Sequence, residues 1–370
     1  MSTVRAIELR LIGLPLVRPF RTSFGTSTEK VCVLVRLETD DAEGWGECVA
    51  DLEPGYSEEF NDGVWLVLRD HLGPALLRAG EIEIEDLDGV LTHVRGNPMA
   101  KATLIDAFVD TELRARGVAL ATWLGGVRDR VRCGVSVGIA DSTESLLDQV
   151  DGYLGEGYQR IKLKIEPGTD VERVAAVRAA YPDIALSVDA NAAYSIDDVD
   201  VFRTLDAHGL LMIEQPLHQG DIVRHAELQR AISTDICLDE SIRSAADAAA
   251  AIELGSCRIV NIKQGRVGGV HEAKRVHDVC LAADVPVWCG GMLETGIGRA
   301  QNLALASLPG FTLAGDTSAS ARYFLDDLTE PFVMAGDGTM AVPRGPGIGV
   351  TPRPDRLTET TRRVESIVPA

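Results

Sequence analysis

From about residue 130 onward, short apolar runs alternate with segments of helical periodicity. The apolar runs are CGVSVGI (133–139), RIKLKI (160–165), IALSVD (184–189), LLMIE (210–214), DICLD (235–239), RIVNIK (258–263), VPVWCG (285–290) and FTLAG (311–315). The clearest helical segments are 144–154, 171–181, 245–254 and 269–283. Strands that alternate with helices pair in parallel through right-handed crossovers, and eight such units close a (β/α)8 barrel. We therefore predict an α/β fold with a barrel of this kind. A doubly wound open sheet is the alternative, but no glycine-rich fingerprint follows its first strand.

The first 125 residues have a different pattern. Residues 7–16 and 30–38 alternate as strands, a turn-forming stretch follows at 39–44, and residues 58–116 are largely helical in pattern. We predict an α+β capping domain over residues 1–125 and a barrel domain over residues 126–321. The tail, residues 322–370, cannot be a ninth barrel unit, so we expect it to cover the barrel or to complete the capping domain. Within the tail, Gly336, Asp337 and Gly338 suggest a hairpin.

Composition excludes several classes of function. The 370 residues are 45% hydrophobic and 25% charged, and the net charge of −20 comes without any basic run, so we expect no nucleic-acid partner. No stretch of about eighteen apolar residues occurs, and the first residues lack a signal-peptide core, so we expect no membrane partner and a cytoplasmic location. The seven cysteines lack CxxC spacing, which argues against a disulfide framework or a thiolate zinc site.

Five charged residues recur at a nearly constant interval. Lys164, Asp189, Glu214 and Asp239 are 25 residues apart, and Lys263 follows after 24 more. Each ends an apolar run or nearly does, which places all five at the mouth of a barrel, where barrel enzymes bind their substrates. Three carboxylates so close together need a cation. All-oxygen ligation favours Mg²⁺ over zinc, with Mn²⁺ or Co²⁺ as possible substitutes, so we predict that Asp189, Glu214 and Asp239 bind Mg²⁺.

The two lysines of RIKLKI lie on one face of the predicted strand, because side chains alternate along a strand. An edge strand with a solvated cationic face is one interpretation. The alternative is catalytic: Lys164 is a general base, while Lys162 lowers its pKa and helps to hold an anionic substrate. Lys263 lies four strands away, so a carbon held between Lys164 and Lys263 could lose a proton to one side and regain it from the other. A small carboxylate that loses its α-proton suits such a site, because a divalent cation stabilises the enolate.

Other candidate residues each have two interpretations. Asn191 either supports the site from behind or caps the next helix, and Glu240 either orients a ligand or balances Lys263. Gly291 and Met292, in the run 289–298, either approach a substrate or form a plain tight turn. Ser318 lies in GDTSAS (315–320), which offers amides to an anion or caps a helix.

Several motifs resemble those of one known family. KLK (162–164), VDAN (188–191), IEQPL (213–217), LDES (238–241) and NIKQGRVGG (261–269) are similar to motifs of the muconate-lactonizing branch of the enolase superfamily. PFRTSFGT (19–26), GWGE (44–47) and the run 288–309 extend the resemblance over essentially the whole chain. Within that branch, the chain most resembles o-succinylbenzoate synthases that also racemize N-succinyl or N-acyl amino acids.

The resemblance implies roles for particular residues. Lys164 and Lys263 would be the acid/base pair, and Asp189, Glu214 and Asp239 the magnesium ligands. Residues 20–25 would belong to a mobile loop of the capping domain, with Phe24 among the pocket walls, whereas GWGE would be structural. The resemblance also implies a symmetric homo-oligomer and a role in menaquinone biosynthesis or amino-acid-derivative racemization. Muconate cycloisomerase, dipeptide epimerase and a non-catalytic carboxylate-binding protein remain alternatives.

Overall fold

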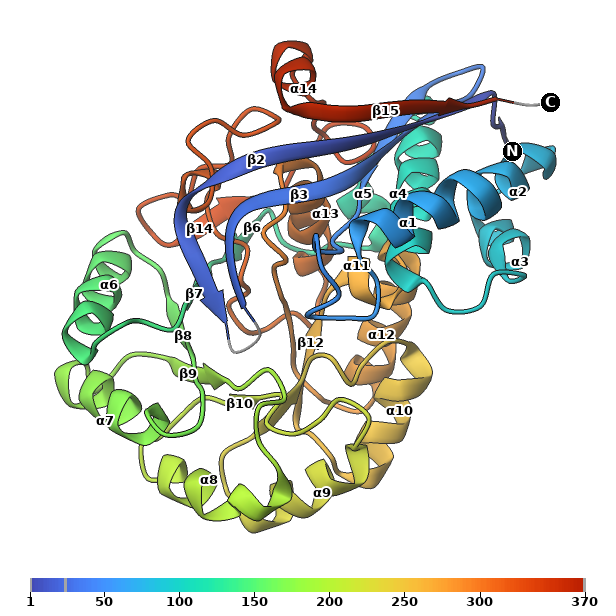
Figure 1. The fold of residues 1–370 in the computed structure, drawn as a ribbon. Helices are drawn as coiled ribbons and strands as arrows, with labels where there is room; N and C mark the ends of the chain where they lie inside the picture. Colours follow the sequence, from blue (N-terminus) through green and yellow to red (C-terminus); the bar gives the residue numbers. More distant parts are fainter. Residues whose placement is uncertain (1, 23–24, 369–370) are drawn as a thin grey trace.

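Seven parallel strands form the curved sheet at the centre of the molecule (Figure 1). The computed structural model describes residues 2–22 and 25–368. The strands, in chain order, are β7 (Gly134–Val137), β8 (Arg160–Lys164), β9 (Leu186–Asp189), β10 (Ile213–Glu214), β11 (Ile236–Leu238), β12 (Ile259–Ile262) and β13 (Val287–Cys289). Their order in the sheet is also their order in the chain, with every pair parallel. The predicted barrel strands at 133–290 are therefore confirmed, although each is shorter than its apolar run.

The eighth predicted run, 311–315, is not a regular strand. It makes one parallel bridge at each end, Val287 to Phe311 and Cys133 to Gly315, so it still joins the two edges of the seven-stranded sheet. The amide of Phe311 bonds to the carbonyl of Leu308 and not to a neighbouring strand. The apolar content of this run predicted a strand, but the local turn at Phe311 prevents regular pairing along it.

Helices surround the sheet (Figure 1). They are α6 (Thr143–Gly155), α7 (Asp170–Ala180), η3 (Ile196–Asp198), α8 (Val199–Asp206), α9 (Ile222–Ala231), α10 (Ala245–Leu254), α11 (Gln264–Val267), α12 (Val270–Ala282), α13 (Gly296–Ala306) and η4 (Ser320–Arg322). Their ends follow from local chemistry. Ser142 and Ser244 accept hydrogen bonds from the first turns of α6 and α10, and Gly255 ends α10 in the left-handed conformation.

Both ends of the chain build the cap. Its elements are β1 (Ser2–Thr3), β2 (Ala6–Thr22), β3 (Gly25–Glu38), β4 (Glu43–Glu47), α1 (Asn61–Val67), η1 (Leu68–Leu72), α2 (Gly73–Arg78), β5 (Glu81–Ile82), η2 (Ile84–Asp86), α3 (Leu87–Leu91), α4 (Pro98–Ala115), α5 (Leu120–Leu124), α14 (Pro354–Thr360) and β15 (Thr361–Ile367). The sheet order is β15-β2-β3-β4, so a strand from the tail completes the sheet begun at the N-terminus. Figure 1 shows β15 lying along β2.

The predicted tail hairpin is wrong in its pairing. Residues 335–339 do form a turn, with Gly338 in the left-handed conformation. However, the strand that follows, β14 (Thr339–Ala341), pairs antiparallel with β6 (Arg130–Arg132) at the base of the barrel. A turn residue pattern specifies the reversal of the chain but not the partner of the strand that leaves it.

The hairpin of β2 and β3 reaches from the cap sheet over the barrel (Figure 1). Near its tip, the carbonyl of Arg21 accepts a hydrogen bond from the amide of Ile139, at 3.1 Å. The Arg21 guanidinium also lies 3.6 Å from carboxylate oxygens of Asp141 and Glu166, in the loops that follow β7 and β8. The cap thus contacts the mouth of the barrel directly.

The glycines of GWGE allow close packing inside the cap. A Cβ atom on Gly46 would lie 2.0 Å from the carbonyl oxygen of Thr103, and one on Gly44 would lie 2.4 Å from the amide of Thr111. Both neighbours belong to α4, the long buried helix of the cap. These two glycines therefore serve the packing of α4 against β4.

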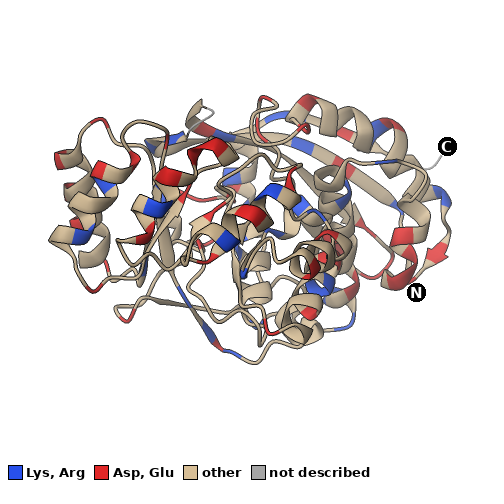
Figure 2. Ribbon diagram, turned by 90° about the horizontal axis from the view of Figure 1, so that it is seen from below, with Lys and Arg blue, Asp and Glu red and all other residues tan. Residues whose placement is uncertain are grey.

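Charged residues of both signs share the same helices at the surface (Figure 2). Arg224 pairs with Glu227 on α9, and Lys274 pairs with Asp278 on α12. Among the residues that the structure describes, no helix is long and apolar enough to cross a membrane.

One buried carboxylate links the cap to the barrel. Asp106 of α4 accepts a hydrogen bond from the amide of Val270 at the start of α12, at 2.9 Å. Its second oxygen has no partner within residues 2–22 and 25–368. Burial, aided by the negative charge of Asp110, raises the pKa of Asp106 from 3.8 to about 7.

We predict that Asp106 makes stability fall as the pH rises. The folded state keeps a proton that the unfolded chain releases above about pH 4, so the folded state loses relative stability between about pH 4 and 7. Asp106→Asn removes the titration. The variant should therefore gain about 1 kcal/mol or more in unfolding free energy over the wild type at pH 8, but not at pH 4. Urea denaturation at both pH values measures this. The exposed Asp148→Asn is the control, and equal effects of the two variants would contradict the prediction.

Candidate active site

A cavity of about 420 Å³ lies between the cap and the mouth of the barrel. Its lining comes from the β2–β3 hairpin, the loop after β4 and the ends of the barrel strands. The described lining residues are Phe20, Thr22, Gly25, Thr26, Ser27, Thr28, Glu29, Val31, Asp51, Leu52, Glu53, Gly55, Tyr56, Ser136, Lys162, Lys164, Asn191, Lys263, Gly291, Met292, Leu293, Asp316 and Tyr323. Three lysines therefore line the same cavity.

The five residues at constant spacing do lie at strand ends. Lys164, Asp189 and Glu214 are the last residues of β8, β9 and β10, and each is paired in register with its neighbour. Asp239 and Lys263 directly follow β11 and β12. Because the carboxyl ends of parallel strands share one edge, the register alone brings these side chains to the same rim.

The three carboxylates are buried, and each accepts a hydrogen bond from a lysine ammonium group. Asp189, Glu214 and Asp239 are at most 1% exposed. Asp189 accepts from Lys164 at 2.6 Å, Glu214 accepts from Lys162 at 2.8 Å, and Asp239 accepts from Lys263 at 2.8 Å. Burial alone would raise the pKa of Asp189, but the ammonium groups of Lys164 and Lys162 outweigh it and lower that pKa. Burial and the charge of Asp189 raise the pKa of Glu214.

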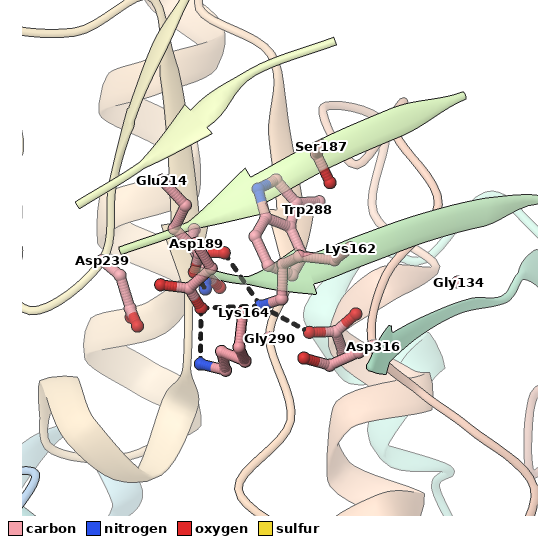
Figure 3. A network of polar contacts seen from close by, with 12 residues as sticks. Gly134, Lys162, Lys164, Ser187, Asp189, Glu214, Asp239, Trp288, Gly290 and Asp316 are labelled. Carbon is pink, nitrogen blue, oxygen red and sulfur yellow. Dashed lines mark hydrogen bonds and ion pairs between the residues drawn. The ribbon is translucent and has the colours of Figure 1, made fainter. Parts of the chain in front are cut away.

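Lys162 is the centre of this network (Figure 3). Its ammonium lies 3.2 Å from Asp189, 2.8 Å from Glu214 and 2.8 Å from Asp316. It also lies 4.8 Å from the ring centre of Trp288. Burial disfavours the charge, but the three carboxylates prevail and raise the pKa of Lys162. For Lys162, this direction is opposite to the one that crowding by a second ammonium would give, so Lys162 is a fixed positive charge at neutral pH.

Asn191 orients Lys164 and is itself held by Glu240. The ammonium of Lys164 donates to Oδ1 of Asn191 at 2.6 Å, and Nδ2 of Asn191 donates to Glu240 at 2.9 Å. Asn191 has a φ of 43°, a left-handed conformation that asparagine tolerates better than most residues. Asn191 also lines the cavity, so it lies in the site itself.

Lys263 approaches the cavity from β12, with partners from both domains. Besides Asp239, its ammonium contacts the hydroxyl of Tyr56 at 3.2 Å and lies 4.5 Å from the centre of the Tyr56 ring. Burial works against its charge, but Tyr56, Glu240 and Glu214 raise the pKa of Lys263. Gly290 allows this placement, because a Cβ atom there would lie 2.7 Å from Cε of Lys263.

The remaining predicted residues divide into three groups. Gly291 and Met292 line the cavity. Ser318 is fully buried, and its hydroxyl donates to the carbonyl of Gly134 at 3.4 Å, behind the cavity wall. Phe24 lies outside the described residues.

Sequence reasoning missed two members of the site. Asp316 follows the eighth apolar run, where attention went to the backbone amides of GDTSAS and not to this carboxylate. Arg266 donates to Asp239 from the first turn after Lys263, and it also donates to the carbonyls of Ile242 at 2.8 Å and Asn261 at 2.7 Å. The position of Asp316 directly after an apolar run could have identified it, whereas nothing in the spacing singled out Arg266.

The donor set suits a hard divalent cation. Within the described part of the chain, no three His, Cys, Asp or Glu side chains lie close enough together to hold a metal as they stand. Even so, one ammonium, that of Lys162, touches both Asp189 and Glu214, so these carboxylates can share a cation. In addition, one buried oxygen of Glu240 lacks a hydrogen-bond partner among the described residues. Oxygen donors of this kind are the ligands that Mg²⁺ prefers.

Family models match most of the chain. Residues 6–125 match the mandelate racemase / muconate lactonizing enzyme N-terminal domain, and residues 145–356 match the enolase C-terminal domain-like family. The chain belongs to the enolase superfamily. Within the superfamily it is 58% identical to the N-succinylamino acid racemase of an Amycolatopsis species over 356 residues, 96% of each chain. It is 47% identical to the o-succinylbenzoate synthase of Geobacillus stearothermophilus, over 94% of this chain and 92% of the relative.

Solved structures of the superfamily agree with this assignment. A member from Listeria innocua superposes with a TM-score of 0.95 at 38% identity, covering 100% of both chains. An N-succinyl Arg/Lys racemase from Bacillus cereus superposes with a TM-score of 0.92 at 26% identity, covering 99% of this chain and 100% of the other.

We predict that Asp316 is required to compensate buried charge. Asp316 bonds to both Arg160 and Lys162, so Asp316→Asn leaves two buried cations with one fewer anion. Breaking such a buried pair should lower the unfolding free energy by about 3 kcal/mol. The exposed pair of Arg258 and Asp235 gives the control: Asp235→Asn should cost less than about 1 kcal/mol. Denaturant titration of both variants measures this, and equal small losses would contradict the prediction.

Proposed function

We propose that this chain removes the proton next to a substrate carboxylate, acting as an o-succinylbenzoate synthase, as a racemase of N-succinyl or other N-acyl amino acids, or as both. The observation that carries the proposal is the placement of Lys164 and Lys263. They enter one cavity from β8 and β12, which have three strands between them in the sheet. Relatives at 58% and 47% identity carry the names of these two activities.

Each lysine has a distinct task in the proposed chemistry. Lys162, whose charge is fixed, attracts the substrate carboxylate into the cavity. Lys164 takes the α-proton, and Lys263 faces the same carbon from the other side. In racemization, Lys263 then returns a proton to the opposite face. In the dehydration, Lys164 passes its proton to the departing hydroxyl on the same face, while the ammonium of Lys263 stabilises the enolate electrostatically.

Asp189, Glu214 and Asp239 would hold Mg²⁺. When bound, the ion supplies positive charge beside the substrate carboxylate, which lowers the cost of the enolate. The protein itself limits the access of water, because the hairpin of β2 and β3 and the loop with Tyr56 line the cavity from the side of the cap. Enclosure strengthens the electrostatic contacts of the three lysines.

Two assays test the proposal on the purified protein with Mg²⁺ present. One follows deuterium incorporation at the α-carbon of N-succinyl amino acids in D₂O. The other follows turnover of 2-succinyl-6-hydroxy-2,4-cyclohexadiene-1-carboxylate to o-succinylbenzoate. Activity in at least one assay is expected. Activity in neither would contradict the proposal and favour a carboxylate-binding protein without catalysis.

We predict that the two lysines act on opposite enantiomers. Lys164→Ala and Lys263→Ala should each abolish racemization, because each removes the proton acceptor or donor of one face. Each variant should also lose α-proton exchange with one enantiomer, by about 100-fold or more, and retain part of the exchange with the other. NMR of the two enantiomers in D₂O, measured separately, checks this.

Lys274→Ala is the matched control for the lysine variants. Lys274 is an exposed lysine on α12 that pairs with Asp278, and its loss should leave both exchange rates unchanged. If Lys263→Ala exchanged both enantiomers at wild-type rates, the two-sided mechanism would be wrong.

A further inference from the structure

Two charged side chains of the cap are buried away from the lysines of the site. Lys30 of β3 is 2% exposed and Glu47 of β4 is 0% exposed, and neither is among the described residues that line the cavity. A buried charge is costly unless it is bound by polar partners. Both side chains bind the segment 292–298, which runs from the loop after β13 into the first turn of α13.

Glu47 binds the beginning of α13. Its carboxylate accepts from the amide of Thr295 at 2.9 Å, from the hydroxyl of Thr295 at 2.6 Å and from the amide of Gly298 at 2.9 Å. Thr295 is the N-cap residue of this helix. A carboxylate from the cap thus satisfies amides that the helix itself leaves without partners.

Lys30 binds the same loop at Met292, three residues after the end of β13 at Cys289. Its ammonium donates to the carbonyl of Met292 at 3.0 Å and to that of Val49, within the cap, at 3.5 Å. Burial opposes its charge, but Asp51 and Glu47 contribute to raising the pKa of Lys30, so it stays cationic. One ammonium therefore ties a carbonyl of the barrel loop to a carbonyl of the cap.

The loop held in this way is a wall of the cavity. Gly291, Met292 and Leu293 line the cavity, and Leu293 has a φ of 58°, which is unfavourable for leucine. A strained backbone persists only where its surroundings hold it. Inside the barrel, Glu294 accepts from the amide of Met292 at 2.8 Å and from the side chain of Asn302 at 2.9 Å, and its carbonyl accepts from Arg299 at 2.8 Å. The contacts that come from the cap are those of Lys30 and Glu47.

We propose that Lys30 and Glu47 are positioning residues: they hold the turn of residues 290–295 as a cavity wall, so that the cap sets the fit of the substrate through residues that do not touch it. This inference rests on the proposed function for its kinetic consequence. Lys164 and Lys263 are placed by barrel strands, so a loosened wall should weaken substrate binding and leave proton transfer largely intact.

Three variants and one control separate this role from general destabilisation. Lys30→Met removes the ammonium and keeps the aliphatic stem, and Glu47→Gln replaces a carboxylate oxygen with a donor facing an amide. Thr295→Val removes the hydroxyl that donates to Glu47 and accepts from the amide of Ile297, and it leaves the Glu47 carboxylate in place, so it provides a test even if Glu47→Gln does not fold. Glu43→Gln is the control, because Glu43 lies on the same strand but pairs with Arg36 at the surface.

Two measurements decide the outcome. In hydrogen-exchange mass spectrometry of the full chain, peptides covering 290–299 should exchange about tenfold faster in the folded Lys30→Met and Thr295→Val variants, while peptides covering β8 and β12 should not change. In the α-proton exchange assay, KM should rise about tenfold with kcat within about threefold of wild type. The control should match the wild type in both.

Failure of the proposed function and failure of the positioning role give different results. A wild type that is inactive in both the exchange assay and the o-succinylbenzoate assay contradicts the proposed function, and the hydrogen exchange of the 290–299 peptides still tests the positioning role. Wild-type protection of these peptides in both variants would overturn the inference, as would a loss of kcat at unchanged KM.

Discussion

Compensation of buried charge at the strand ends is the constraint on which the rest of the site depends. Asp189, Glu214 and Asp239 are almost completely buried, and each accepts from a lysine, of which Lys162 and Lys263 are buried and Lys164 is partly buried. Neither the carboxylates nor the ammonium groups could be buried in this low-dielectric region without the other, because an unpaired buried charge costs several kcal/mol. The lysines and the carboxylates are thus mutually required. Lys162, which contacts three carboxylates, is the charge that the network can least lose.

The architecture supplies this network and then covers it. Parallel pairing in register brings the ends of β8, β9 and β10 to one rim, so residues 25 apart in the chain become neighbours. The cap, built from both chain ends, closes the cavity with the β2–β3 hairpin and places Tyr56 on Lys263. Charges from the cap also reach the barrel, through Glu47 at α13 and Lys30 at Met292. The barrel and the cap therefore both contribute residues that form or hold the walls of the cavity.

Much of this was predictable because it follows from periodicity. The alternation of apolar runs and helical segments predicted β7 to β13. The positions of Lys164, Asp189 and Glu214 at the ends of these runs predicted that they lie together at the rim of the barrel. The eighth run was mispredicted as a regular strand: a local turn bond at Phe311 leaves it with one bridge at each end, and hydrophobicity does not reveal such a turn. The raised pKa of Lys162 was not predicted. That direction depends on Asp316, which reaches Lys162 only through the closure of the barrel. Contacts between the cap and the barrel, such as those of Tyr56, have no sequence period and could not be derived.

Isothermal titration of Mg²⁺ into protein freed of metal by a chelator tests most directly whether the strand-end carboxylates act as one cation-binding group. The wild type should bind one Mg²⁺ per chain. Asp189→Asn and Glu214→Gln should each weaken binding severely, while Asp235→Asn, at an exposed ion pair, should bind as the wild type does. Absence of Mg²⁺ binding by the wild type, or undiminished binding by the Asp189 and Glu214 variants, would contradict the shared role of these carboxylates.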